Sequence, residues 1–208
     1  MVLTLIHIGK CGGSSLRTEL YKKNIKFNCF HTQKVAYDKN ANYVIIIRNP
    51  IQRFISAFNW RHKLVCKDKS NQNRFMNEYN LLNKYNNVDN LCNELKTNKN
   101  IFNQHTLSGN YIHHLREDIY YYLDDIIDKC LPSQIKCVIL IETMNEDLKE
   151  YFDIDLSIHE KNNSQYSKII SDENYKILKD YLKRDYEIID KMYQKGWIDE
   201  FKYNILKK

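Results

Sequence analysis

The sequence has no internal repeat and no linker rich in proline or serine, and glycine and proline are scarce, at 5 and 2 of 208 residues. A chain of this length can bury one sizeable core, so we expect a single domain over residues 1–208. Apolar residues make up 43% of the chain, including 16 Tyr and 8 Phe, which is enough core material to exclude a disordered protein. The composition therefore predicts one globular domain.

Residue spacings typical of metal sites and of disulfide frameworks are also missing. The six cysteines include no CxxC pair, and no HxxxH is present. His113 and His114 are adjacent, so they cannot share one face of a helix. We predict free, buried thiols and no structural or catalytic metal.

The chain opens with MVLTLIHI, an apolar run without a basic leader region or a cleavage signal. The run is too short to span a bilayer, so we expect no integral membrane segment and a cytoplasmic location. The formal net charge is +6, but the lysines are scattered, with no basic block and no nucleic-acid-binding motif. We therefore expect no nucleic acid among the partners.

Three apolar runs, Val2–Ile8, Tyr43–Ile47 and Cys137–Ile141, have the composition of buried strands, and helical spacing resumes soon after each run. This alternation predicts an α/β fold with a central parallel sheet flanked by helices. We expect residues 61–130 to be mostly helical, with a surface loop within Asn83–Asn100.

Near the C-terminus, residues 171–194 have the apolar spacing of one long amphipathic helix, which Gly196 ends.

The stretch HIGKCGGSS, residues 7–15, contains three of the five glycines and joins the first strand to a helix. A tight turn of this kind directs backbone N–H groups and the positive end of a helix dipole at one point, which suits a phosphate or a similar anion. Gly12 and Gly13 would let a ligand approach the backbone, while Lys10, Ser14 and Ser15 add a charge and two hydroxyls. A turn that merely needs small residues is the alternative.

The order of residues in this stretch differs from the common nucleotide-binding loops. A Walker A loop places its lysine directly after the glycines, whereas Lys10 precedes them. The GxGxxG dinucleotide fingerprint is absent as well. A P-loop nucleotide or metabolite kinase is therefore kept only as an alternative.

The segment HIGKCGGSSL resembles the 5'-phosphosulfate loop of sulfotransferases, whose carbohydrate-type members, such as the heparan and chondroitin enzymes, read close to IPKTGGTSL. The segment RNPIQRFISAF is similar to the family's 3'-phosphate motif and supplies Arg48 and Ser56. VILIETMNEDL and HEKNNS resemble the family's late strand and a loop that closes over the nucleotide. The loop departs from the family at Gly9, where Pro is usual, and at Cys11, where Thr is usual.

This resemblance implies a three-layer, P-loop-like fold and a sulfotransferase that uses 3'-phosphoadenosine 5'-phosphosulfate (PAPS) and releases 3'-phosphoadenosine 5'-phosphate (PAP). The acceptor it implies is a hydroxyl on a carbohydrate, with a tyrosine or a small molecule as the alternatives. We expect no metal to take part, because the residue spacings of metal sites are missing. Lys10 would neutralise the bridging oxygen, Arg48 and Ser56 would hold the 3'-phosphate, and Lys161 and Asn163 would contact the nucleotide. The 5'-phosphosulfate would be held by Lys10, Cys11, Gly12, Gly13, Ser14, Ser15 and Leu16.

Sulfuryl transfer needs a base for the acceptor's proton, and histidine is suited to this at neutral pH. His31 follows the predicted strand NIKFNCF, in the interval where such enzymes place a base, and is our candidate. Lys34 lies close to the same position, and Glu142 is a further candidate. A third reading is a nucleotide- or polyanion-binding module without turnover.

Overall fold

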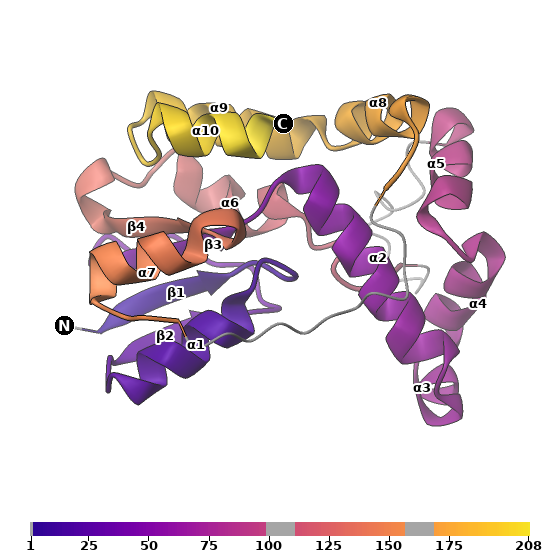
Figure 1. The fold of residues 1–208 in the computed structure, drawn as a ribbon, viewed down its shortest axis with the longest axis horizontal. Helices are drawn as coiled ribbons and strands as arrows, with labels where there is room; N and C mark the ends of the chain where they lie inside the picture. The colour runs from indigo at the N-terminus through magenta and orange to yellow at the C-terminus, as the bar shows by residue number, and fades with distance from the viewer. Residues whose placement is uncertain (1, 99–110, 157–168) are drawn as a thin grey trace. The chain divides into compact units, whose positions relative to one another are not determined.

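Four parallel strands form one sheet in the order β2-β1-β3-β4 (Figure 1). The structure is a computed structural model that describes residues 2–98, 111–156 and 169–208. The strands are β1 Leu3–His7, β2 Phe27–Phe30, β3 Tyr43–Ile47 and β4 Ile135–Leu140. This arrangement confirms the predicted α/β fold with a parallel sheet flanked by helices.

Branched apolar residues account for the central strands. Val44–Ile47 and Val138–Leu140 are buried on both faces of the sheet, as expected of parallel strands that helices cover. From β1 the chain goes to β2 at one edge of the sheet, and from β3 it goes to β4 at the opposite edge. Because such crossovers are right-handed, α1 covers one face of the sheet and α6, which belongs to the same unit, covers the other.

The chain divides into two compact units. Unit 1 comprises residues 1–50, 119–162 and 185–208, and unit 2 comprises residues 51–118 and 163–184. The helices are α1 Gly13–Lys22, α2 Pro50–Cys66, α3 Lys69–Arg74, α4 Met76–Tyr85, α5 Val88–Thr97, α6 Ile119–Ile127, α7 Met144–Phe152, α8 Asp172–Tyr181, α9 Lys183–Gln194 and α10 Glu200–Lys207. The 3-10 turns are η1 Pro132–Gln134 and η2 Ile141–Thr143. A single domain over residues 1–208 stays a prediction.

The surface loop predicted within Asn83–Asn100 is present at Asn86 and Asn87, which are exposed and separate α4 from α5. Most of the remaining described stretch is helical, because Asn87 caps α5 by accepting a hydrogen bond from the Asn90 N–H at 2.8 Å. One sequence expectation about helices was wrong. The predicted long helix over residues 171–194 is broken at Leu182 into α8 and α9, and the boundary between the units falls just after this break.

A buried ion pair joins α10 to β4 and α7 in unit 1. Lys202 Nζ lies 2.8 Å from Asp147 Oδ1 and donates to the Val138 carbonyl at 2.7 Å. Asp147 Oδ2 also accepts hydrogen bonds from the Leu140 N–H and the Thr143 hydroxyl, each at 2.9 Å. A single carboxylate therefore connects the last helix to the end of the sheet.

The N-cap of α10 yields a stability prediction. Asp199 accepts a hydrogen bond from the Lys202 N–H at 2.8 Å, so Asp199→Ala is expected to cost about 1 kcal/mol of unfolding free energy. Urea denaturation would measure this loss. Asp199→Ser, which preserves a capping oxygen, and Asn204→Ala, at an exposed position of the same helix, should each change stability by under about 0.5 kcal/mol. An equal loss in Asp199→Ser would contradict the capping role.

All six cysteines are free thiols, as predicted, but only four are buried, because Cys29 and Cys66 are half-buried. Burial raises the pKa of Cys92 and of Cys137 to about 12, so both stay protonated at neutral pH. None of the helices formed by the described residues combines the length and apolar composition that a bilayer span requires.

Candidate functional site at the carboxyl edge of the sheet

The loop from Ile8 to Gly12 turns the chain from β1 into α1 through two left-handed residues. Lys10 has φ 69° and Gly12 has φ 85°. The Cys11 N–H closes the turn on the Ile8 carbonyl at 3.3 Å. Left-handed residues next to helical ones form backbone concavities that accept anions. The predicted strand, glycine loop and helix are therefore confirmed as a local structure.

Packing inside the protein explains why residues 12 and 13 are glycines. A Cβ on Gly13 would lie 2.0 Å from Cδ2 of His7, and one on Gly12 would lie 2.5 Å from Cε of Met144. Gly12 also needs its positive φ, which side chains disfavour. These two glycines make room for protein side chains, so their presence alone does not indicate a ligand.

Some of the backbone N–H groups predicted to hold the anion already donate hydrogen bonds within the protein. The N–H groups of Ser15 and Leu16 both donate to the Gly12 carbonyl, at 3.0 and 3.3 Å. Cys11 uses its N–H in the turn, and the side chains of Cys11 and Leu16 are fully buried. We therefore remove three residues from the predicted backbone donors to the anion, namely Cys11, Ser15 and Leu16.

The amides that remain are those of Gly12, Gly13 and Ser14. In the described part of the chain these three N–H groups have no hydrogen-bond acceptor, and no side chain caps α1. The Ser14 side chain is exposed and that of Ser15 is partly so. An anion at this point would meet three amides, two hydroxyls and the positive end of α1.

Strand register aligns the candidate residues along one edge of the sheet. Ile6 pairs with Phe30, so the next residues, His7 and His31, are neighbours. Ile47 pairs with Leu140, so Arg48 follows β3 beside the start of η2. The chain diverges from β1 and β3 in opposite directions, which makes their carboxyl ends the topological switch point, where α/β sheets bind ligands.

His31 lies directly beside the glycine loop. Its ring stacks on the His7 ring with 3.9 Å between the centroids, and the Tyr122 hydroxyl donates to its carbonyl. The Nδ1 atom of His31 is 3.2 Å from the His7 carbonyl oxygen. Because a carbonyl only accepts, Nδ1 carries the proton in the neutral ring and Nε2 carries the lone pair. This tautomer suits a general base.

Lys34, the alternative candidate for the base, forms an ion pair with Asp124. Its Nζ donates to Asp124 Oδ2 at 2.6 Å, and this hydrogen bond raises the pKa of Lys34. The amine therefore stays protonated at neutral pH, which argues against Lys34 as the base.

Arg48 and Glu142 form a loose pair at the other end of the same edge. Arg48 Nε lies 3.8 Å from Glu142 Oε1, and the two side chains are 18% and 29% exposed. Burial raises the pKa of Glu142, against the opposing effects of its own backbone N–H, of Arg48 and of the Asn49 N–H. The guanidinium of Arg48 is thus partly exposed, and the nearby Glu142 carboxylate partly offsets its positive charge.

The remaining predicted site residues are not placed at this edge of the sheet by the described structure. Ser56 lies on α2 in unit 2 and is half-buried. Lys161 and Asn163 lie outside the described residues. Among the described residues, no three His, Cys, Asp or Glu side chains are grouped to hold a metal ion.

Comparisons with protein-family models, curated proteins and solved structures give no match to this chain. Its function must therefore be argued from the geometry of this edge.

Proposed function

We propose that the chain is a PAPS-dependent sulfotransferase that transfers a sulfuryl group to a hydroxyl, on a carbohydrate acceptor, and that its sheet is of the P-loop-like type. One observation carries the proposal. The switch-point edge of the sheet brings together an uncapped glycine loop with Lys10, His31 and Arg48.

The residues at this edge fit a donor with anions at two ends. Three amides and the hydroxyls of Ser14 and Ser15 offer a site for the 5'-phosphosulfate, and Lys10 lies in the same turn. Arg48 offers a second cationic group, at the end of the strand beside β1. Bound PAPS would supply an activated sulfuryl group.

In this proposal each residue has a separate task. The amides of Gly12, Gly13 and Ser14 orient the anion, and Lys10 offsets charge that develops on the bridging oxygen. His31 Nε2 takes the proton from the acceptor hydroxyl, while the contact from Nδ1 to the His7 carbonyl holds the ring and its tautomer. Glu142, with its raised pKa, pairs with Arg48. It follows β4, whereas His31 follows β2 at the opposite edge of the sheet, so we assign Glu142 to positioning Arg48.

Thermal shift measurements test the cofactor assignment. PAP at about 100 times its dissociation constant should add roughly 2.7 kcal/mol of stability and raise Tm by several degrees, whereas Mg-ATP should not. Arg48→Ala should abolish the shift. Glu142→Gln, which removes the competing charge, should keep or increase it. Lys136→Ala, which removes an exposed lysine of β4 in the same unit, serves as the matched control and should leave it unchanged.

Transfer of labelled sulfate from PAPS to a panel of carbohydrates tests the reaction itself. His31→Asn retains an N–H that can contact the His7 carbonyl but removes the base, so turnover should fall about 10²- to 10⁴-fold while the PAP shift persists. A Tm shift with Mg-ATP alone would favour the kinase. A PAP shift without turnover on any acceptor would favour a non-catalytic module, and no PAP shift at all would overturn the proposal.

A further inference from the structure

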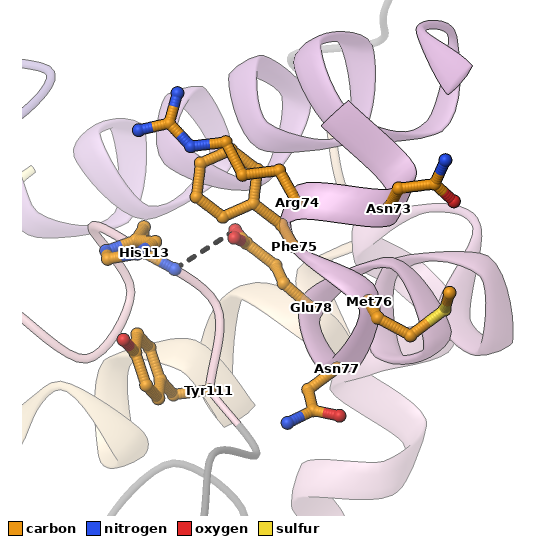
Figure 2. Close-up of a pocket in the computed structure, with 8 residues that line it drawn as sticks. All are labelled: Asn73, Arg74, Phe75, Met76, Asn77, Glu78, Tyr111 and His113. Carbon is orange, nitrogen blue, oxygen red and sulfur yellow. Dashed lines mark hydrogen bonds between the residues drawn. The ribbon is translucent and has the colours of Figure 1, made fainter. Parts of the chain in front are cut away.

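A pocket of about 300 Å³ lies within unit 2, lined by residues 73–78, Tyr111 and His113 (Figure 2). This volume is at the lower end of the range of about 300–1,000 Å³ found for small-molecule sites. Figure 2 shows Tyr111 and His113 on one side of the pocket and Phe75 and Glu78 on the other. None of these residues takes part in the edge described above.

Three rings line the pocket, those of Phe75, Tyr111 and His113, and together they are called its aromatic wall. The His113 ring meets Tyr111 edge-on at 5.0 Å and Phe75 edge-on at 6.0 Å, with interplanar angles of 84° and 82°. Aromatic rings attract a further ring in edge-to-face or offset geometry. The wall therefore suits a small cyclic ligand.

The charges around the pocket leave one guanidinium available. Arg61 holds Glu78 through two hydrogen bonds of 2.6 and 2.7 Å, and Arg116 holds Glu117 at 2.8 Å. Arg74 has no carboxylate partner among the described residues, and its guanidinium is placed 5.0 Å over the Phe75 ring.

Arg74 therefore leaves the pocket with a net positive charge, next to the aromatic wall. Because a guanidinium binds carboxylate, sulfate and phosphate through paired hydrogen bonds, a ligand with an oxyanion is favoured over a neutral one.

We infer that this pocket binds a monocyclic organic oxyanion, with the anionic group on Arg74 and the ring against His113 and Tyr111. The inference does not rest on the proposed sulfotransferase activity, because it concerns other residues and a direct binding event.

Protein-observed NMR titration of the full chain with benzoate, benzamide and acetate tests the inference. Benzamide has nearly the shape of benzoate but no charge, and acetate has the charge but no ring. Benzoate should bind at least about tenfold more tightly than either, with shifts at Phe75 and His113 that added PAP does not reverse.

Two charge-matched variants locate the site. Arg74→Gln should weaken benzoate binding about tenfold or more, to the level of benzamide. Lys69→Gln removes an exposed positive charge at the other end of the same helix, α3, and should change affinity less than twofold. Equal binding of benzamide and benzoate, equal losses in the two variants, or shifts confined to other residues would each overturn the inference.

Discussion

Gly13→Ala is expected to lower the unfolding free energy by about 1–3 kcal/mol, the usual cost of forcing extra volume into a packed site. The new Cβ would lie 2.0 Å from one ring atom of His7 and 2.3 Å from another. The His7 ring cannot move away freely, because it is 4% exposed and stacks on His31. Thermal or urea unfolding would measure the loss.

This substitution separates packing from ligand access as the reason for the glycine. Gly13 is the first residue of α1, and alanine has the higher helix propensity by about 1 kcal/mol. If Gly13 served only the approach of a ligand, alanine would be neutral or stabilising without ligand. A stabilised Gly13→Ala variant would therefore contradict the packing argument.

Two further variants complete the test. Gly196→Ala meets open space at φ 69°, so it measures the cost of a left-handed alanine alone, about 1–2 kcal/mol. His7→Ala in the Gly13→Ala background removes the clashing ring. The two substitutions should therefore be less destabilising together than the sum of the single changes.

Glu78→Ala is expected to destabilise the chain by about 3–5 kcal/mol, the largest effect predicted here. The side chains of Arg61 and Glu78 are 7% and 4% exposed and share two short hydrogen bonds, and the His113 N–H also donates to Glu78. Removing the carboxylate leaves the Arg61 charge buried and uncompensated.

A double substitution distinguishes the cost of an unpaired charge from the cost of lost packing. Arg61→Met with Glu78→Met removes both charges and fills similar volume, so it should recover most of the stability that either single change loses. Glu94→Ala breaks the exposed pair with Lys84 and should cost under about 1 kcal/mol. If the double variant is as unstable as Glu78→Ala, the cost does not come from the unpaired charge.

The sequence predicted the strands well because parallel strands buried on both faces appear as unbroken apolar runs. Tyr43–Ile47 was located to the residue, and Leu3–His7 lies within the predicted run. The loop after β1 and the placement of Arg48 at the end of β3 followed from the same reasoning. The contact of His31 with His7 needed the pairing register, which the sequence alone does not contain.

The misses have local physical causes. Asparagine is common in loops, and the loop predicted within Asn83–Asn100 is present but short, at Asn86 and Asn87. The signal for α5 was the apolar spacing of its buried residues, Val88, Leu91, Cys92 and Leu95. No glycine or proline marks the break at Leu182, so periodicity continued across it. The pocket at Arg74 depends on residues 73–78 meeting Tyr111 and His113, which no sequence pattern joins.

The strand order also bears on how the chain is synthesised. The strands β1, β2 and β3 are complete once residue 47 has been made, but the partner of β3 on its open side, β4, begins only at residue 135. The ribosome therefore has to make helices α2 to α6 before the open edge of β3 can pair with β4. An exposed apolar edge is the kind of surface on which nascent chains aggregate or recruit chaperones.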